Sequence, residues 1–452
     1  MDLLGKRVLI LGLGISGVSA ANFCAAKGAL VLAADQAQET EISGLDALTS
    51  GIQTVTGGDL PDPADFDLVV PSPGIPNARY AERARSVAGD IELAGQFLEV
   101  PIIAVTGTNG KSTTVRLIEA MLQSAGLRAK AAGNVGTPAL SLVGQALDVA
   151  VLEVSSFQLE AVEQFQPRVA AILNISPDHL DRHGDFAGYC RAKQRILERQ
   201  GPGDTAILNF DDPVTRELAK RCKARVWSFS RRHPVENGVG LDTGVALLRD
   251  GNQVRRVSLD ALRLEGVHNL ENVLAALAAV AALGVDPDRA IAALLDFEGL
   301  PHRSEVVATV SGVTFINDSK ATNPGAAARS LEGARSPLVW IAGGRDKGLD
   351  FAQLAELAAV RVKSALFYGE CAGRLADAVA GRIDVRQTED LAQAFALAAA
   401  TARAGDTVLL APACSSFDQF KSFEERGEHF CRAVRDYAKT ANTANTEQET
   451  KN

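Results

Sequence analysis

What the sequence has little of excludes several classes of protein. Its six cysteines, at positions 24, 190, 222, 371, 414 and 431, are scattered and form no C-x-x-C pair. This spacing argues against a zinc site or a disulfide framework and is typical of free thiols in a reducing compartment. The longest uncharged apolar run, VLAALAAVAALGV at 273–285, is too short to cross a bilayer. We therefore expect a cytoplasmic protein that has no membrane partner.

The chain also lacks an excess of basic residues. Its formal charge is −9, which argues against a nucleic-acid partner because such proteins usually present a basic face. An acidic protein can still bind anions locally, through lysines and helix N-termini. At 452 residues the chain is too long for one ordinary core, so we expect several domains.

Strands and helices alternate along most of the chain, which favours parallel sheets with crossover helices. Strands are expected at 7–12, 29–34, 67–70, 149–152, 169–173, 205–208, 313–317, 338–342, 365–368 and 407–411. Alternating residues around Asp250-Gly251 predict an antiparallel hairpin over 245–257. The pattern predicts an α/β fold of three domains, at 1–92, 93–299 and 300–440, with a disordered polar tail at 441–452. The first and third domains read as Rossmann-like, and the hairpin forms a small antiparallel patch on the central parallel sheet.

Two glycine motifs predict nucleotide binding. Gly12-x-Gly14-x-x-Gly17, with Asp35 after the next strand, is typical of a diphosphate-bearing nucleotide, although a tight turn without a ligand stays possible. The second motif is AVTGTNGKSTT at 104–114, in which Val105 stands where the common P-loop has glycine. The loop residues Gly107, Thr108, Asn109 and Gly110 would surround phosphate oxygens, Lys111 would neutralise them, and Ser112 or Thr113 would reach a magnesium ion. The central domain is therefore expected to be a P-loop-type ATPase domain.

Polar residues after buried strands are further candidates. Glu153 follows the run VAVL, where a carboxylate is costly unless it serves a metal or a cation. His179, next to Asp178, is open to both a structural and a ligand interpretation, and Lys193 reads as a solvated helix lysine. In the third domain, NDSKATN (317–323) and GGRDKGLDF (343–351) each end a strand. Their lysines 320 and 347, with hydroxyls at 319, 322, 415 and 416, suit a small carboxylate, or else a solvated basic rim.

The motifs, in their order, resemble those of the Mur ligases of bacterial cell-wall synthesis. The matching segments span nearly the whole chain: GLGISG, SPGIP, TGTNGKSTT, GNVG, EVSSFQLE, NISPDHLDRH, RAKQRI, GVHNLENVLAA, LPHR, NDSKATNP, GGRDKG and APACSSFDQFKSFEERGEHF. The resemblance is greatest to the members that use ATP to add D-glutamate to UDP-N-acetylmuramoyl-L-alanine through an acyl phosphate. It implies that the short Gly-x-x-Gly-Lys loop binds ATP.

The resemblance also implies roles for particular residues. The UDP-substrate would contact Ile15, Ser16, Asp35, Ser72, Pro73, Gly74 and Asn134. ATP would contact the loop 107–113, with Lys111 on the phosphates, and also Asn272, Arg303 and Asp318. Two magnesium ions would be held by Ser112, Glu153, His179 and Lys193, the last carbamylated by carbon dioxide, and Arg303 would add charge during catalysis. D-Glutamate would contact Lys320, Thr322, Lys347, Ser416 and Phe423.

Three other interpretations stay open on the residues. A nicotinamide-dependent oxidoreductase would use the first glycine motif but would leave the lysine loop without a role. A nucleotide-gated binding or motor protein would use the lysine loop without forming an amide. A related ligase that adds a different amino acid is the nearest alternative. We expect a monomer.

Overall fold

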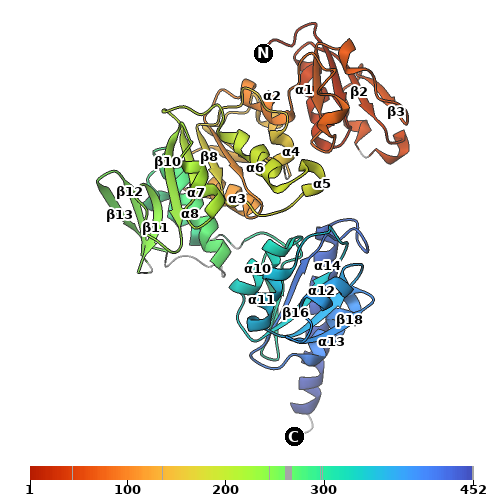
Figure 1. The fold of residues 1–452 in the computed structure, drawn as a ribbon, viewed down its shortest axis with the longest axis vertical. Coiled ribbons are helices and arrows are strands. Elements are labelled where there is room, and N and C mark those ends of the chain that lie inside the picture. Colours follow the sequence, from red (N-terminus) through yellow and green to blue (C-terminus); the bar gives the residue numbers. More distant parts are fainter. Residues whose placement is uncertain are drawn as a thin grey trace. The chain divides into compact units, whose positions relative to one another are not determined.

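The strands of the described residues form three sheets (Figure 1). The structure is a computed structural model; it describes residues 1–449 apart from residues 43, 135, 244, 260–266, 296 and 298, and for residues 267, 268 and 442–449 it describes the backbone alone. The first two sheets belong to one compact unit, and the third belongs to a second unit that also includes residues 176–178. The α/β fold with three sheet-based domains is confirmed.

The first sheet is parallel, with the strand order β3-β2-β1-β4. Its strands are β1 (Arg7–Leu11), β2 (Leu30–Asp35), β3 (Gln53–Thr56) and β4 (Leu68–Pro71), and helix α1 (Ile15–Ala26) follows β1. Because β2 and β4 lie on opposite sides of β1, the carboxyl ends of β1 and β4 flank a topological switch point. Open α/β sheets bind their ligands at such a point.

The second sheet has the order β13-β12-β11-β10-β9-β8-β5-β7-β6. Its strands are β5 (Ile102–Thr106), β6 (Ala129–Gly133), β7 (Val149–Glu153), β8 (Val169–Ile172), β9 (Thr205–Asn209), β10 (Arg225–Ser230), β11 (Gly238–Asp242), β12 (Val245–Asp250) and β13 (Gln253–Val257). Its helices are α3 (Lys111–Ser124), α4 (Ser156–Leu159), α5 (Leu180–His183), α6 (Phe186–Gln194), α7 (Pro213–Ala219), α8 (Val267–Ala282) and α9 (Pro287–Ile291). Among the described residues of this sheet, pairing is antiparallel only at β11-β12 and β12-β13, which confirms the predicted hairpin and antiparallel patch.

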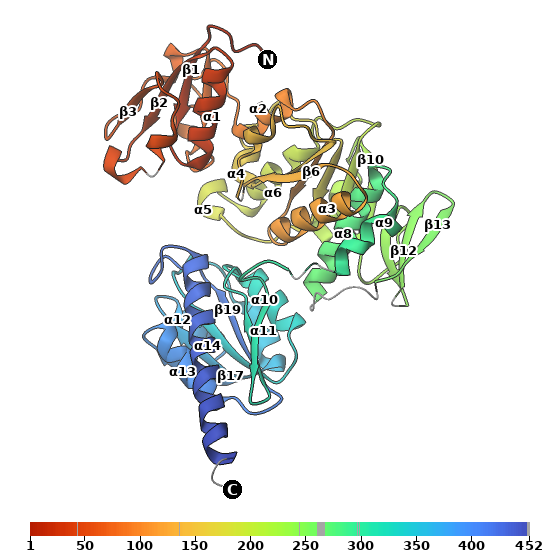
Figure 2. The same cartoon turned by 180° about the vertical axis from the view of Figure 1, so that it is seen from behind.

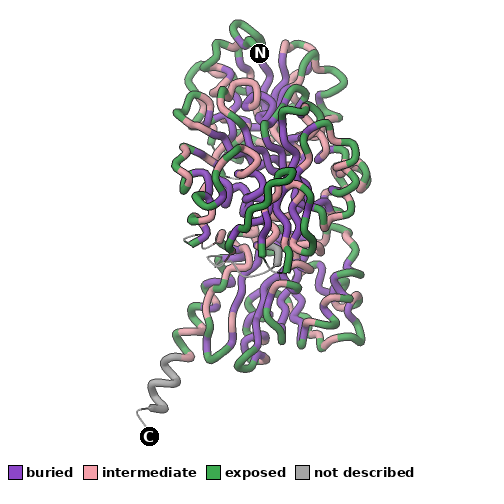
Figure 3. The backbone as a smooth tube through the Cα atoms, turned by 90° about the vertical axis from the view of Figure 1, so that its left-hand side faces the viewer, coloured by how far each residue is buried: buried purple, intermediate pink, exposed green. Residues whose placement is uncertain are grey.

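The third sheet has the order β14-β15-β19-β16-β17-β18, and of its described strands only β14 runs antiparallel to its neighbour. Its strands are β14 (Glu305–Val310), β15 (Val313–Asn317), β16 (Leu338–Gly343), β17 (Val362–Tyr368), β18 (Asp384–Thr388) and β19 (Thr407–Ala413). Its helices are α10 (Pro324–Gly333), α11 (Ala352–Arg361), α12 (Ala372–Ala378), α13 (Leu391–Thr401) and α14 (Phe423–Glu449). The central strands of this sheet, such as β16 and β19, are fully buried, as expected for a sheet covered by helices; Figure 3 colours the buried residues purple.

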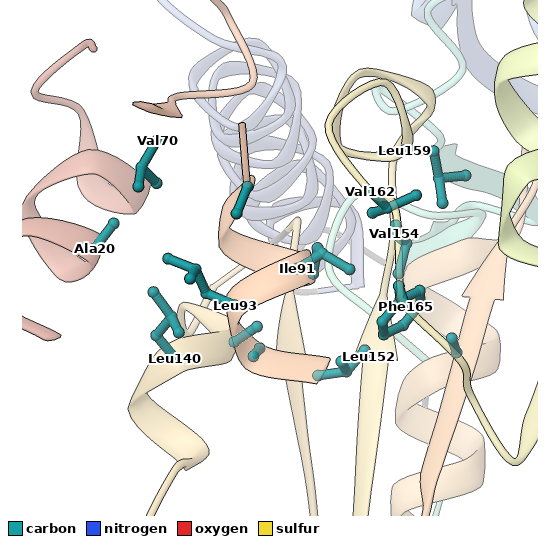
Figure 4. Packing of buried hydrophobic residues seen from close by; sticks show 14 of the residues in the cluster. Ala20, Val70, Ile91, Leu93, Leu140, Leu152, Val154, Leu159, Val162 and Phe165 are labelled. Atoms are coloured by element: carbon teal, nitrogen blue, oxygen red, sulfur yellow. The ribbon is translucent and has the colours of Figure 1, made fainter. Parts of the chain in front are cut away.

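Helix α2 (Asp90–Phe97) links the cores of the first two sheets. Ile91 and Leu93 are both fully buried on it. In Figure 4, Ile91 points toward Leu159 and Val162, whereas Leu93 points toward Leu140. One apolar cluster therefore runs from the first sheet through α2 into the second.

The tail departs from the prediction. Helix α14 continues to Glu449, into the segment 441–452 for which the composition predicts disorder, and residues 450–452 lie outside the described residues. Alanine, glutamate and glutamine in this segment have good helix propensity, which a polarity-based prediction ignores. Among the described residues, every helix is too short or too polar to cross a membrane.

Candidate nucleotide and substrate sites

The first glycine motif builds a tight turn at the switch point of the first sheet. Gly12 has φ +85°, and a Cβ added to Gly17 would lie 1.8 Å from the carbonyl oxygen of Gly12. The Ser72 hydroxyl donates to the same carbonyl at 2.8 Å. Asp35 Oδ2 accepts from the Leu13 amide at 2.7 Å, so this carboxylate holds the turn itself. The predicted residues of this motif are thus brought together.

The other predicted residues of this site lie beside that turn. Ile15 and Ser16 are the first residues of α1, and the Ile15 side chain is exposed. Pro73 and Gly74 follow β4 directly. Helix N-termini bind anions through free amide groups and the helix dipole, so the start of α1 suits a diphosphate.

The second glycine motif forms a closed loop between β5 and α3. Gly107 and Gly110 have φ +155° and +88°, and a Cβ added to Gly110 would lie 2.3 Å from Asn272 Oδ1. The Asn174 side chain accepts from the Asn109 amide at 2.9 Å and donates to the Asn109 carbonyl at 3.0 Å. The loop shape therefore depends on two glycines that no larger residue could replace without rearrangement.

Two lysine ammonium groups converge on this loop. Lys111 Nζ donates to the carbonyls of Gly107 and Thr108 at 2.9 and 3.1 Å. Lys193 Nζ donates to the Gly107 carbonyl at 2.9 Å and lies 4.7 Å from the centre of the Tyr189 ring. Lys193 is only 1% exposed, so its interpretation as a solvated lysine is wrong. A buried ammonium close to another is costly, which favours an anion or a chemical change at this position.

Glu153 ends β7 and is buried. Its Oε1 accepts from Asn134 Nδ2 at 3.0 Å. In the part of the chain that the structure describes, no lysine or arginine pairs with this carboxylate. A buried carboxylate with only an amide partner needs a cation, and carboxylate and hydroxyl oxygens are the ligands that magnesium prefers. Glu153 and the buried Ser112 hydroxyl, at the start of α3, thus fit a magnesium ion.

His179 stands in an unusual conformation before α5. Its φ of 52° and ψ of 36° are left-handed. Its ring packs edge-on against Phe157 at 4.8 Å and lies 6.4 Å from Tyr189, whose hydroxyl is 3.2 Å from the Thr108 hydroxyl. Aromatic contacts therefore connect His179 to the nucleotide loop. Helices α4 and α5 both pack against α6 in this region (Figure 2).

In the second unit, the carboxyl edge of the sheet carries the remaining candidates. Asp318 Oδ2 accepts from the hydroxyls of Ser304 and Ser330. Lys320 Nζ lies 3.6 Å from the centre of the Phe423 ring, so these two candidate residues lie together. Lys347 Nζ lies 3.7 Å from Asp178 Oδ1, and Ser416 is buried. Thr322 and Arg303 are partly buried.

Arg426 organises this edge and was not predicted. It is fully buried on α14 and donates to the Ser319 hydroxyl and to the carbonyls of Ser319, Gly343 and Cys414. Arg426 lies in the segment FEERGEHF. The helical pattern of this segment does not predict its burial, because its hydrogen-bond partners are far away in the sequence.

Asp90 was missed for the same reason. It is buried at the start of α2, where it hydrogen-bonds the Ser16 hydroxyl and accepts from Gln158 Nε2 at 2.9 Å. Burial raises the pKa of this carboxyl. Asp90 thus joins the first glycine motif to the segment that follows Glu153.

His302, Glu305 and Cys431 group as metal ligands do. The side-chain amide nitrogen of Asn317, Nδ2, however, lies 2.9 Å from His302 Nδ1, 3.4 Å from Glu305 Oε2 and 3.1 Å from Cys431 Sγ. This amide donor occupies the point where these acceptors converge, so the cluster is a hydrogen-bonded network.

Comparison with known proteins matches the three parts of the chain to three family models. Residues 6–95 match the Mur ligase MurD-like N-terminal domain, residues 105–280 the Mur ligase middle domain, and residues 302–414 the Mur ligase glutamate ligase domain. The UDP-N-acetylmuramoylalanine–D-glutamate ligase of Pelotomaculum thermopropionicum is 43% identical over 96% of this chain and 98% of that protein. The chain belongs to the Mur ligase family. The ligase of the same name from Koribacter versatilis is 44% identical over 97% of this chain and 99% of its own length.

Solved Mur ligase structures share the fold. The UDP-N-acetylmuramate-alanine ligase of Thermotoga maritima has a TM-score of 0.60 at 19% identity, covering 96% of this chain and 100% of that chain. The MurF ligase of the same organism, in complex with ADP, has a TM-score of 0.61 at 18% identity, covering 97% and 100%. The family resemblance drawn from the motifs is confirmed.

Proposed function

We propose that this Mur ligase joins D-glutamate to UDP-N-acetylmuramoyl-L-alanine, with ATP as the energy source. The observation that carries the proposal is the full-length identity of 43% and 44% to two ligases named for this reaction. The nucleotide loop with its two converging lysines supports it. We further propose that the enzyme acts in the cytoplasm as a monomer, in peptidoglycan precursor synthesis.

Each domain has its own ligand in this proposal. We assign 1–92 to the UDP-substrate, 93–299 to ATP, and 300–440 to D-glutamate and part of ATP. The diphosphate would lie at the start of α1, against Ile15 and Ser16, with Asp35 and the turn 72–74 bounding the crevice, and Asn134 would reach the sugar. D-Glutamate would contact Lys320, Thr322, Lys347, Ser416 and Phe423, whose charges and hydroxyls suit two carboxylates.

The proposed chemistry begins with phosphoryl transfer. The terminal carboxylate of the UDP-substrate attacks the γ-phosphate of ATP, ADP leaves, and an acyl phosphate forms. The amine of D-glutamate then attacks the acyl carbon, phosphate leaves, and the amine loses a proton. A free carboxylate is a poor acyl donor because oxide is a poor leaving group, and phosphorylation corrects this.

The chain's own groups would allow two anions to approach each other. Lys111 neutralises the β- and γ-phosphates, the loop amides of residues 107–113 hold the phosphate oxygens, and Asn272, Arg303 and Asp318 complete the ATP site. Ser112, Glu153, His179 and a carbamylated Lys193 would hold two magnesium ions, which supply charge neutralisation when bound. Carbamylation would turn the buried Lys193 cation into an anion, and this relieves its repulsion with Lys111.

The reaction is tested by phosphate release from ATP in the presence of UDP-N-acetylmuramoyl-L-alanine and a panel of D- and L-amino acids. We expect release only when both co-substrates are present, with D-glutamate preferred. Heavy oxygen placed in the substrate carboxylate should appear in the released phosphate. Phosphate release that needs no amino acid, or NAD-dependent absorbance change, would favour one of the other interpretations.

The carbamate is tested by replacing Lys193 with alanine. We expect activity to fall by about a hundredfold or more, and acetate to restore part of it by filling the vacated carboxylate position. Lys111→Ala is the matched control, because acetate should not restore a lost cation. Full activity of Lys193→Ala without acetate would remove this lysine from the mechanism.

A further inference from the structure

The left-handed backbone of His179 has to be held in place. For a residue with a Cβ such a conformation costs about 1–3 kcal/mol and persists only where the surrounding structure fixes it. Helix α5 is a single turn that directly follows this residue, and the amides of Arg182 and His183 both donate to the His179 carbonyl at 3.1 Å. A single helical turn is not stable on its own in water. The side chains of α5 must therefore supply the anchor.

Glu160 anchors the last two residues of that turn. Its Oε2 accepts from Arg182 Nη2 at 2.6 Å, and its Oε1 lies 3.3 Å from both Arg182 Nε and His183 Nδ1. The side chains of Arg182 and Glu160 are 15% and 12% exposed, so water screens this ion pair only partly. The guanidinium also lies 5.2 Å from the centre of the Phe157 ring, against which the His179 ring packs.

The same guanidinium also contacts the turn at residues 72–75, which follows β4 and which we call the UDP-substrate turn. Arg182 Nη1 donates to the Gly74 carbonyl at 3.3 Å, and Nη2 donates to the Ile75 carbonyl at 2.9 Å. A planar guanidinium offers five donors in a fixed fork, so it can bind a carboxylate and two carbonyls together. A lysine ammonium has all its donors on one nitrogen, so it cannot bind the carboxylate and both carbonyls together.

We infer that Arg182 is a positioning residue that couples the UDP-substrate turn to the metal-binding segment headed by His179. The inference rests on the proposed function, because it takes Gly74 as a substrate contact and His179 as a magnesium ligand. Arg182 touches neither reactant; it acts through the Gly74–Ile75 carbonyls on one side and through Glu160 and α5 on the other. The ordinary alternative is an ion pair that only stabilises the fold.

Arg182→Ala and Arg182→Lys separate these two roles. We expect the UDP-substrate to bind about 10- to 100-fold more weakly to both variants, and the magnesium concentration for half-maximal activity to rise by a similar factor. At saturating magnesium, ATP binding should stay near the wild-type value, because the nucleotide loop makes no contact with Arg182 among the described residues. Arg191→Ala, which removes an exposed arginine of α6, is the matched control and should leave all three values unchanged.

Chemical rescue supplies a readout that a purely structural role would not move. Arg182, Glu160 and His183 line a cavity of 630 Å³, so a small cation can reach the position that Arg182→Ala vacates. We expect millimolar guanidinium to restore part of the UDP-substrate affinity. Urea has the same shape without the charge and should restore none.

Binding of UDP-N-acetylmuramoyl-L-alanine is measured by calorimetry without ATP, so that no turnover is required. Absence of binding to the wild-type protein would contradict the proposed function. Equal binding by the wild-type protein and Arg182→Ala would overturn the coupling inference alone. A parallel loss of ATP binding and melting temperature, without guanidinium rescue, would also overturn it and leave the ion pair a structural role.

Discussion

At the scale of single residues, two glycines at opposite ends of α3 take almost the same left-handed conformation but have different surroundings. Gly110 has φ +88° and Gly126 has φ +90°. A Cβ on Gly110 would meet Asn272 Oδ1 at 2.3 Å, whereas a Cβ on Gly126 would meet no atom within 4 Å. Alanine at either position therefore carries the same backbone strain, about 1–2 kcal/mol, but only alanine at 110 displaces a neighbour.

This contrast gives the first prediction. Gly110→Ala should weaken ATP binding by about tenfold or more, because the added methyl group moves Asn272 and distorts the loop amides. Gly126→Ala should lower the melting temperature similarly but leave ATP affinity near the wild-type value. Isothermal calorimetry with ATP and thermal melting measure the two quantities. Equal ATP affinity in both variants would contradict the role of the close contact.

A second residue-scale prediction concerns His183. Burial lowers the pKa of its imidazole below the ordinary value of 6.5, although the nearby Glu160 carboxylate opposes the shift; Arg182 and Lys193 reinforce it. The folded protein thus holds the ring neutral, and the unfolded chain binds the proton first as pH falls. The stability that the neutral ring contributes is present above pH 6.5 and is lost as pH falls below that value.

His183→Phe removes this titration and keeps a ring against Phe157 and Tyr189. We expect the melting temperature of the variant to fall less steeply than that of the wild type between about pH 7 and pH 5. Melting curves across that range measure the slope. Identical slopes would show that His183 does not carry this pH dependence.

Two residues of this region have surroundings that their local sequence does not indicate. The pattern around Lys193 predicts a solvated lysine, because a helix lysine is usually exposed and nothing local shows the Gly107 carbonyl as its partner. The motif NISPDHLDRH contains Arg182 but does not mark it as partly buried, because Glu160 and the Gly74 carbonyl are far away in the sequence. For both residues, contacts with segments far away in the sequence determine where the side chain lies.

At the scale of elements, the strongest signals were long apolar strands and glycine turns. The strand ALFY and the hairpin around Asp250-Gly251 were predicted and are present as β17 and β12-β13. Strand β6, with the sequence AKAAG, was not predicted because alanine and glycine have low strand propensity. It forms because its backbone pairs in register with β7, from Ala129 with Val149 onward. Backbone hydrogen bonds to β7, and not the strand propensity of its side chains, determine this strand.

Helix α2 offers an element-scale prediction through Glu92. This buried carboxylate accepts hydrogen bonds from the backbone amides of Glu163, Gln164 and Phe165 at 2.8–3.0 Å. Glu92→Ala removes the acceptor from three amides, each of which costs about 1–3 kcal/mol when buried without a partner. We expect a loss of about 3 kcal/mol or more in the free energy of unfolding.

Glu92→Gln is the control, because it keeps one acceptor oxygen and should lose less stability than alanine. Urea unfolding measures both variants, and an unchanged m-value shows that the unfolded states are comparable. Should both variants be as stable as the wild type, Glu92 would not hold the 163–165 segment against α2.

At the scale of the whole molecule, the division into two compact units has thermodynamic consequences. The first unit joins two sheets through one apolar cluster that includes α2, whereas the third sheet has separate clusters of its own. The sequence predicted three domains from three alternating runs. The sequence does not indicate that the first two domains share a core. Nothing in the sequence of α2 shows that its residues pack against both sheets.

Two units with separate cores should unfold in separate steps. Leu152→Ala changes a fully buried residue of the first unit, and Leu331→Ala changes one of the second. Each substitution removes about 2–5 kcal/mol from the core it belongs to. We expect two transitions in scanning calorimetry, of which Leu152→Ala lowers one and Leu331→Ala lowers the other. A single transition that both substitutions lower equally would mean that the two units unfold cooperatively, because an interface of comparable strength to the cores would then couple them.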